Sequence, residues 1–502
     1  MTGQPEAMRF DIDWHRRAEQ IELEGRAFID GSHADAISGG QMETVKPRDG
    51  SVLARIAACD AADVDAAVSA ARRSFESGQW SEAHPRVRKR VLHELVDRIQ
   101  ADREEIGLLI SLEMGKPITD AIGEVDSSCR ELAFFAEAVD KVYGNTVPTD
   151  AKSLGMSVRE PKGVIGAVTP WNFPLMMPIY KVAPALAAGN SIVLKPAEQS
   201  SLAAIRLAEL ASEAGLPDGV LNVVPGTGEK AGRSLGLHMD VDAITFTGST
   251  SIGKAFLAYS SESNMKGVWL ECGGKSPNVV LADAPDLDRA AEFAAETIFH
   301  GAGQVCNAGS RLIVERPIYE DFVSRVARES LKWAPADPLD ASAKMGPLVD
   351  RPALDRALGY VSAAKSDGAT VVSGGGETLE ATGGYFMEPT ILGSVDNSMP
   401  VAQEEIFGPV LAAIELEERG EATRLANGSR YGLAAAIWTS DFGRAHRVAR
   451  ALKAGTVYIN CYDRGDNSLP FGGFKESGIG VDRSLAAMEK YSNLKTIWAD
   501  IS

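Results

Sequence analysis

The chain has 502 residues, 45% of them hydrophobic and 24% charged, which suits a globular protein of two or three domains and argues against disorder. A formal net charge of -18 argues against nucleic acids and anionic membranes as partners, because both favour a basic surface. The five cysteines are odd in number and widely spaced, so they predict no disulfide framework and indicate a reducing compartment.

The N-terminal run Met1–Glu6 lacks a basic segment followed by an apolar one, and no stretch approaches the roughly 18 apolar residues of a membrane helix. No His-x-x-x-His or His-Glu-x-x-His pair occurs among the seven histidines, so no metal is predicted. We expect a soluble, cytoplasmic protein that has no nucleic-acid or membrane partner.

The first predicted helix runs from Ala61 to Phe75, because apolar residues recur there at helical spacing after a capping Asp60. A second helix follows through Val87 and Ile99. From residue 163, helical patterns such as the one that begins at Leu202 alternate with apolar runs. These runs cover 163–168, 191–194, 221–224, 242–246 and 267–270. The alternation predicts a parallel, doubly wound sheet.

A second alternation starts at 277–281 and continues through 312–314, 370–372 and 434–438, so a second α/β domain is expected. No long Pro/Gly/Ser linker separates the two, which predicts domains in close contact with a cleft between them. Residues 143–161 and the stretch after Lys490 fit neither domain, and the sequence alone allows them to be edge strands.

Cys306 is a candidate nucleophile, because Gly303, Ala308 and Gly309 would leave a substrate carbonyl room to approach it. A cysteine attacks as the thiolate, so its pKa, about 8.5 in solution, would have to be lowered by a helix N-terminus or a positive charge. A buried, inert thiol is the default for a lone cysteine. We assign that default to Cys59, Cys129 and Cys461. Cys272 is adjacent to Glu271, so a place near the site is the alternative to the packing role that we favour for it.

Glu271 is a candidate general base, because it ends the strand-like Val268-Trp269-Leu270 and is followed by Cys272-Gly273-Gly274-Lys275. The alternative is a solvated charge at a strand end. Upstream, Ala243–Phe246 leads into Thr247-Gly248-Ser249 and a helix, which suits a phosphate bound at a helix N-terminus. This segment is not a Gly-x-Gly-x-x-Gly fingerprint.

Together these segments resemble the aldehyde dehydrogenase superfamily, over about Arg26 to Trp498 and in the family's order. The other matching motifs are Thr169-Pro170-Trp171-Asn172-Phe173-Pro174, Lys195-Pro196-Ala197-Glu198, Glu404-Glu405-Ile406-Phe407-Gly408-Pro409 and Pro470-Phe471-Gly472-Gly473. Two positions depart from the family pattern: Cys272 replaces a leucine, and Gly480-Val481-Asp482 replaces glycine-arginine-glutamate. Whether Asp482 serves in a proton relay is open at this point.

The resemblance implies an α/β fold with a Rossmann-like cofactor domain, an α/β catalytic domain and a small β oligomerisation arm. It assigns residues 1–142 and 162–272 to the NAD-binding domain, 273–483 to the catalytic domain, and 143–161 with 484–502 to the arm. A homodimer or homotetramer is expected.

The resemblance also implies NAD-dependent oxidation of an aldehyde to the carboxylic acid, through a thiohemiacetal and a thioester on Cys306, with Glu271 as the base. Asn172 and the Cys306 backbone N–H would bind the oxyanion. Lys195 is counted with the catalytic group. It would also hold the adenosine ribose together with Glu198, whose charge would repel a 2′-phosphate and favour NAD over NADP. The other predicted cofactor contacts are Thr169, Trp171, Gly228, Thr247, Gly248, Ser249, Gly273, Glu405 and Phe407.

For the substrate tail we predict apolar walls from Phe173, Tyr180 and Phe471, and a cationic group bound by Asp463 and Asp466. Because Arg464 could bind an anionic tail, that alternative stays open. The segments 136–144, 263–266 and 484–491 resemble those of bacterial gamma-glutamyl-gamma-aminobutyraldehyde and guanidinobutyraldehyde dehydrogenases, which favours an aminoaldehyde over aliphatic, aromatic or semialdehyde substrates. Acyl transfer to coenzyme A and a non-catalytic relative are the remaining alternatives.

Overall fold

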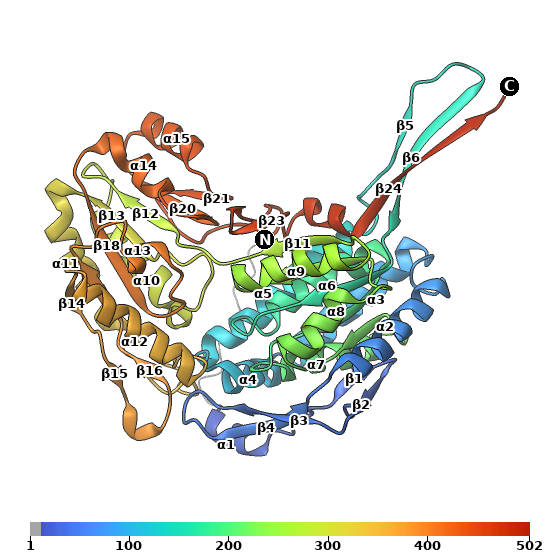
Figure 1. Ribbon diagram of the computed structural model, residues 1–502, viewed down its shortest axis with the longest axis horizontal. Coiled ribbons are helices and arrows are strands. Elements are labelled where there is room, and N and C mark those ends of the chain that lie inside the picture. Colours follow the sequence, from blue (N-terminus) through green and yellow to red (C-terminus); the bar gives the residue numbers. More distant parts are fainter. Residues whose placement is uncertain (1–11) are drawn as a thin grey trace.

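The computed structural model describes residues 12–502, and Figure 1 shows two lobes with an arm that projects from one of them. The run Met1–Glu6, in which no targeting segment is predicted, lies outside the described residues, as does the beginning of the predicted NAD-binding segment up to residue 11. From residue 12 onward, no helix is both long and apolar enough to cross a membrane. The same residues contain no group of three or more His, Cys, Asp or Glu that could hold a metal ion.

The first lobe, on the right in Figure 1, is built on an eight-stranded sheet. Its strands, in spatial order, are β2 (Ser32–Ala34), β1 (Ala27–Ile29), β9 (Leu221–Val223), β8 (Ser191–Lys195), β7 (Val164–Val168), β10 (Ala243–Thr247), β11 (Gly267–Glu271) and β23 (Gly478–Ile479). The five from β9 to β11 are parallel, and counted from β7 they have the order 3-2-1-4-5 of a dinucleotide-binding fold. They confirm the five predicted apolar runs.

Helices cover both faces of this sheet. They are α2 (Ala61–Glu76), α3 (Pro85–Ala101), α4 (Arg103–Met114), α5 (Ile118–Ala138), α6 (Met176–Ala188), α7 (Leu202–Glu213), α8 (Arg233–Leu237) and α9 (Thr250–Glu262), with α1 (Trp14–Gln20) beside α4. The two predicted N-terminal helices are α2 and α3, and Asp60 caps α2 in a reciprocal capping box with Asp63. Local sequence therefore sets these helix ends.

The second lobe contains a seven-stranded sheet that is parallel except for one edge strand. Its order is β14 (Thr370–Ser373), β17 (Thr390–Gly393), β18 (Val410–Leu416), β13 (Arg311–Glu315), β12 (Pro277–Val280), β20 (Ala434–Trp438) and β21 (Thr456–Ile459). Its helices are α10 (Leu287–Phe299), α11 (Tyr319–Ser330), α12 (Arg351–Ser366), α13 (Pro400–Gln403), α14 (Ala422–Asn427) and α15 (Phe442–Ala451). The predicted second α/β unit is confirmed, and its four apolar runs are β12, β13, β14 and β20.

The arm is a three-stranded antiparallel sheet of β24 (Ser492–Asp500), β6 (Ser153–Pro161) and β5 (Asn145–Val147), and it projects away from both lobes (Figure 1). Three short two-stranded sheets complete the fold: β3 (Gln41–Val45) with β4 (Val52–Ala57), β15 (Glu377–Thr378) with β16 (Phe386–Met387), and β19 (Tyr431–Gly432) with β22 (Phe474–Lys475).

Two predicted segment boundaries need correction. Residues 484–491 are not part of the arm, because the 3-10 helix Leu485–Tyr491 packs against α6 and buries Met488 and Tyr491. The segment 273–483 is not confined to the second lobe, because β23 pairs with β11 in the first sheet. Contacts between segments distant in sequence set both boundaries, and local composition does not reveal such contacts.

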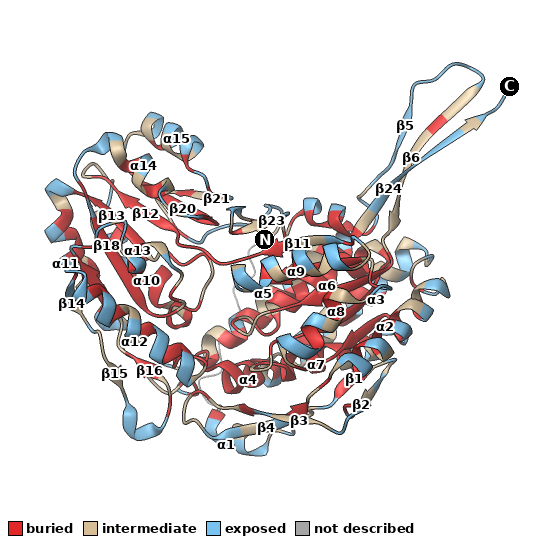
Figure 2. Cartoon of the chain, in the orientation of Figure 1, coloured by how far each residue is buried: buried red, intermediate tan, exposed pale blue. Residues whose placement is uncertain are grey.

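The two lobes meet through opposite edges of their sheets. In the first sheet the carboxyl ends of β8, β10 and β11 carry Lys195, Thr247 and Glu271. In the second sheet Cys306 and Glu405 lie in segments that precede β13 and β18, at the amino edge. Both sheets are buried over most of their length, whereas the arm is largely exposed or intermediate (Figure 2).

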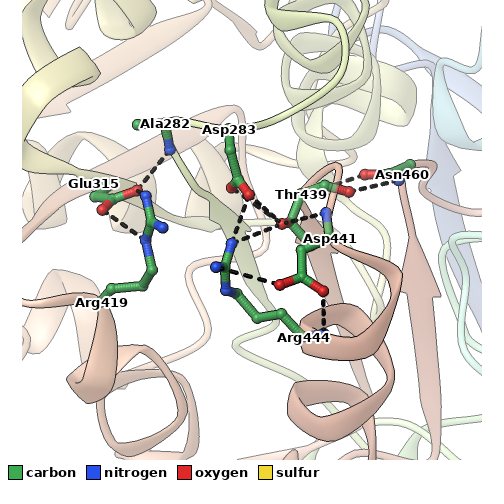
Figure 3. A network of polar contacts seen from close by, with 8 residues as sticks. All are labelled: Ala282, Asp283, Glu315, Arg419, Thr439, Asp441, Arg444 and Asn460. Carbon is green, nitrogen blue, oxygen red and sulfur yellow. Dashed lines mark hydrogen bonds and ion pairs between the residues drawn. The ribbon is translucent and has the colours of Figure 1, made fainter.

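The carboxyl edge of the second sheet is closed by its own polar network, shown in Figure 3. Arg419 forms two 2.8 Å hydrogen bonds with Glu315 at the end of β13, and Arg444 donates to Asp283 beyond β12 at 2.5 Å. Asn460, which follows β21, exchanges two 3.0 Å bonds with Thr439. These groups are hydrogen-bond donors and acceptors for one another. The carboxyl edge, where α/β sheets usually bind ligands, is therefore occupied by internal contacts in the second lobe.

Candidate active site

A cavity of about 360 Å³ lies between the lobes. It confirms the predicted cleft. It brings together Cys306, Glu271, Asn172, Trp171, Thr247, Gly248, Ser249, Gly273, Glu405 and Phe407, all of them predicted site residues, and it is also lined by Pro170, Met177, Cys272 and Arg356. The sequence analysis did not predict the last four as site residues, and it gave Cys272 a packing role.

Cys306 is half-buried in a loop that a strained backbone holds in place. Three consecutive residues before it, Gly301, Ala302 and Gly303, have positive φ angles of 58°, 55° and 72°. A Cβ at Gly303 would lie 2.1 Å from the carbonyl oxygen of Gly408, so this approach requires glycine. The loop thereby brings the thiol against the segment that carries Glu405 and Phe407.

The thiol does not receive the help that the sequence analysis expected. Burial raises the pKa of Cys306, the carboxyl groups of Glu405, Glu271 and Asp463 raise it further, and only the backbone N–H of Asn307 lowers it. Within residues 12–502, the groups that act most strongly on this thiol include no positive charge. The expectation of a pKa lowered by a helix N-terminus or a cation is therefore wrong, and the thiol needs a proton acceptor at the time of reaction.

Glu271 is a candidate for that acceptor in the same cavity. Its side chain is 5% exposed, and neither carboxylate oxygen has a hydrogen-bond partner among residues 12–502. Burial raises the pKa of Glu271 well above its usual value, the Asp482 carboxylate adds to the rise, and Lys181 and Lys490 oppose it. A buried, unpartnered carboxyl with a raised pKa has the properties of a general base that works near neutral pH.

Asn172 lies in the loop between β7 and α6 and is buried beside the thiol loop. Its amide nitrogen donates one hydrogen bond to the Gln304 carbonyl at 2.8 Å. Gln304 is in turn fixed by hydrogen bonds to Gly301 and Val349. The second N–H of the Asn172 amide remains for a ligand in the cavity, because a side-chain amide has two donors.

The cofactor side of the cavity has polar groups that lack partners. Gly248 donates to the Glu271 carbonyl at 3.0 Å, which ties β10 to β11, and Ser249 caps α9. The buried hydroxyls of Thr169 and Thr247 have no hydrogen-bond partner in the described chain. Orphaned hydroxyls next to a helix N-terminus suit the phosphates and hydroxyls of a dinucleotide, so the residues present fit that ligand.

Lys195 and Glu198 lie just beyond β8, as predicted, with 3.4 Å between Nζ and Oε2. Lys195 also donates to the Pro196 carbonyl at 2.8 Å, and burial lowers its pKa. Lys195 makes no contact with Cys306 or Glu271 within the described chain and does not line the cavity, so the geometry favours its cofactor role over its catalytic one. Gly228 begins the short helix Gly228–Gly232, and a Cβ at Gly228 would meet open space.

Glu405 and Phe407 close the cavity from the second lobe. Glu405 accepts from the Gly274 backbone N–H at 3.0 Å, and burial raises its pKa to about 7. A Cβ at Gly273 would lie 1.9 Å from the Glu405 carboxylate, so a side chain at this position would displace that carboxylate. The rings of Phe407 and Trp171 pack edge to face at 5.3 Å.

On the substrate side, a second cavity of about 180 Å³ reaches Val305 and Asn307, the neighbours of Cys306. Asp463 lines it and accepts from the Asn307 amide at 2.8 Å. Arg464 also lines it, but its guanidinium faces Glu296 at 3.5 Å and lies over the Phe293 ring. Asp466 lines neither cavity, because its carboxylate caps the backbone and hydroxyl of Ser468. Asp463 and Asp466, which were predicted to bind one cationic group, therefore do not line a common cavity of the site.

The three predicted apolar walls lie around this region without lining either cavity. Phe173 has the Lys116 ammonium 3.9 Å from its ring centroid. Burial raises the pKa of the Tyr180 hydroxyl, and Phe471 exchanges backbone hydrogen bonds with Asp482. Lys181 and Lys490, which bind Asp482, were not predicted as site residues, and isolated lysines in helical segments carry no sequence signal for this role.

Comparison with known proteins gives the class. Residues 34–497 match the aldehyde dehydrogenase family. An Escherichia coli K12 protein, NADP/NAD-dependent aldehyde dehydrogenase PuuC, is 48% identical, over 97% of this chain and 98% of that protein. Among solved structures, the gamma-glutamyl-gamma-aminobutyraldehyde dehydrogenase of Burkholderia cenocepacia is 50% identical with a TM-score of 0.96, covering 98% and 99% of the two chains. The indole-3-acetaldehyde dehydrogenase AldA of P. syringae, in complex with NAD+ and IAA, has the same identity and TM-score over 97% and 99%.

The chain therefore belongs to the aldehyde dehydrogenase family. It is an oxidoreductase that acts on aldehydes with a nicotinamide adenine dinucleotide as cofactor.

Proposed function

We propose that the enzyme converts an aldehyde and water into a carboxylate with Cys306 as nucleophile, Glu271 as base and Asn172 as oxyanion donor. The observation that carries these roles is their convergence on one cavity, with Glu271 buried and unpartnered. Glu271 accepts the thiol proton, and the sulfur of Cys306 attacks the aldehyde carbon. The free N–H of Asn172 and the backbone N–H of Cys306 stabilise the negative charge that develops on oxygen.

When bound, NAD would supply the hydride acceptor that oxidation of the thiohemiacetal to a thioester on Cys306 requires. Glu271 gives up the thiol proton to solvent before it takes a proton from water, and the resulting hydroxide equivalent attacks the thioester carbon. The C–S bond breaks, the sulfur takes the proton back from Glu271 to become the thiol, and the acid loses its proton to solvent and leaves as the carboxylate. Thr169, Thr247, Ser249, Glu405 and Phe407 would hold the cofactor. Glu271 argues against acyl transfer to coenzyme A, which needs no hydrolytic base.

We expect Glu198→Ser to improve the use of NADP relative to NAD, because it removes a carboxylate that would face the 2′-phosphate. Repulsion between two unit charges at ~4 Å is about 1 kcal/mol in water and about 4 kcal/mol at the lower effective dielectric constant of a protein surface. A shift of about tenfold in cofactor preference is therefore expected. The measurement is the ratio of kcat/KM values for the two cofactors, with Glu213→Ser on α7 as control. An unchanged ratio would mean that Glu198 does not face the ribose.

For the substrate we infer an aminoaldehyde. Asn307 donates to one carboxylate oxygen of Asp463, which leaves the other oxygen to accept from a cationic amino group. Arg464 forms an ion pair with Glu296, so its charge is not directed at an anionic tail. The Burkholderia relative is named for an aminobutyraldehyde, whereas AldA is named for an indole aldehyde. A neutral aromatic aldehyde is therefore the second candidate.

Asp463→Asn is expected to reduce the preference for 3-aminopropanal over the isosteric butanal by about tenfold, since one charge-assisted hydrogen bond is lost. Asp466→Asn is the matched control and should leave the preference unchanged, because that carboxylate caps Ser468. The measurement is kcat/KM for both aldehydes. A wild-type preference for butanal would exclude the cationic tail.

The arm is proposed to form an oligomer interface in a dimer or tetramer, because it projects from the first lobe and exposes Leu494, Trp498 and Ile501. We also propose the domain division of the sequence analysis with the two corrections above, so that the arm comprises 143–161 and 492–502. A cytoplasmic location stays a prediction from cysteine usage and acidic charge.

A further inference from the structure

A buried carboxylate with two lysines lies close to the proposed base. A Cβ at Gly472 would lie 3.2 Å from Glu271 Oε1, and the preceding residue, Phe471, is hydrogen-bonded to the backbone of Asp482. Asp482 is 1% exposed, and each of its oxygens accepts from a different lysine. Lys181, from the middle of α6, donates to Oδ2 at 2.5 Å. Lys490, from the 3-10 helix Leu485–Tyr491, donates to Oδ1. The Asp482 backbone is fixed as well, through hydrogen bonds with Phe471 in both directions.

The charges of this cluster become balanced only when Glu271 is ionised. Asp482 with Lys181 and Lys490 carries one net positive charge, and a Glu271 carboxylate would cancel it. With a single lysine, the same four positions would hold a net negative charge in a buried region, which is unfavourable for a second carboxylate. The second lysine therefore decides whether ionised Glu271 is compensated.

The other titratable groups near this cluster do not supply that compensation. Next to Glu271 are the thiols of Cys272 and Cys306. Glu131 on α5 and the hydroxyls of Tyr180 and Tyr491 face Asp482. Arg483 faces Glu131, with 3.7 Å between Nε and Oε2. Among the groups that act on Glu271 in the described chain, only Lys181 and Lys490 favour its ionised form.

We propose that Lys490 is a positioning residue for thioester hydrolysis: with Lys181 it clamps Asp482 and supplies the second buried positive charge that allows Glu271 to ionise. The inference rests on the proposed role of Glu271 as the base. It links the segment that leads into β24 of the arm to the chemistry at Cys306.

The test uses p-nitrophenyl acetate, an activated ester that can acylate Cys306 without cofactor. The p-nitrophenol burst reports acylation, and the slower steady release reports hydrolysis of the acyl-enzyme. Both are measured from pH 6 to 9 for wild type, Lys490→Gln, Lys490→Arg, Asp482→Asn and Lys495→Gln, together with thermal unfolding. Lys495 is the matched control, because its only ion-pair partner among residues 12–502 is Glu160 on the exposed arm.

Lys490→Gln should keep the burst amplitude but move the midpoint of the hydrolysis profile up by about one pH unit, which is roughly tenfold slower hydrolysis below both midpoints. Lys490→Arg should restore the profile, since it keeps the charge. Asp482→Asn should move the midpoint down, because a neighbouring negative charge is removed while both lysines stay. Lys495→Gln should match wild type.

An unchanged profile in Lys490→Gln, or an equal loss of burst and hydrolysis, would overturn the proposal. If Lys490→Gln does not fold, the Asp482→Asn variant decides. A hydrolysis midpoint in Asp482→Asn that equals or exceeds the wild-type midpoint would then overturn the proposal. A wild-type enzyme without a burst, or a burst that persists in Cys306→Ala, contradicts the proposed function itself, so the two failures are distinguishable.

Discussion

Replacing Cys306 by alanine is expected to lower aldehyde oxidation by at least about a thousandfold while NAD binding stays nearly unchanged. Each factor of ten in rate corresponds to ~1.4 kcal/mol of barrier, so a thousandfold loss corresponds to about 4 kcal/mol, which is the scale expected of covalent catalysis that the variant removes entirely. The cofactor contacts proposed at Thr247, Ser249 and Glu405 do not involve the sulfur. The alanine side chain is also smaller, so it introduces no clash in the cavity.

The measurement combines turnover, followed by NADH absorbance, with a titration of NAD binding by intrinsic fluorescence. Cys461→Ala is the matched control, because Cys461 is also only partly buried but lines neither cavity of the site. Turnover of Cys306→Ala above about a thousandth of wild type would place the nucleophile elsewhere. Loss of NAD binding would show instead that the thiol loop shapes the cofactor site.

Glu271→Gln is expected to slow thioester formation, because the thiol loses its proton acceptor, and to slow thioester hydrolysis more, because water is no longer activated. The expected trace is a burst of about one NADH per active subunit followed by turnover at least a hundredfold slower. The amide is close in size to the carboxyl group that it replaces. Glu262→Gln on the exposed end of α9 is the control. Undiminished steady turnover would rule out Glu271 as the base.

The same variant tests the raised pKa of Glu271. The base is active only when ionised, so hydrolysis in the wild type should be slow at acidic pH and should increase as the pH rises through a midpoint well above the ordinary glutamate value. This increase should disappear in Glu271→Gln. A wild-type midpoint near the ordinary value would mean that Lys181 and Lys490 outweigh burial.

Sequence patterns predicted the elements that local chemistry controls. The cap at Asp60 and the apolar spacing after it gave α2, and alternating apolar runs gave the five central strands of the first sheet. Motif order then predicted that Cys306, Glu271 and Asn172 share a site, and the cavity contains all three. These features depend on residue types at short spacing, which a sequence displays directly.

Three features could not be read from local sequence. The pKa of Cys306 is raised because carboxyl groups from three separate segments, Glu271, Glu405 and Asp463, surround a buried thiol. Of the two carboxylates predicted to bind the substrate tail, only Asp463 lines a cavity of the site, because Asp466 accepts a hydrogen bond from Ser468. Asp482 binds Lys181 although about three hundred residues separate them. Each outcome depends on burial and on contacts between distant segments.

The sequence by itself determined the class of this protein and the α/β type of both lobes, and it predicted the candidate reacting groups, because these depend on short motifs and on periodicity, which are visible in the sequence without the fold. Only the tertiary structure decided that the carboxyl edge of one sheet meets the amino edge of the other, so that Glu271 and Cys306 share one cavity. It also decided which of the candidate carboxylates are desolvated, paired or free. The physical reason is that protonation and charge compensation depend on the dielectric surroundings and on distance, which are set by packing between segments and not by their order along the chain.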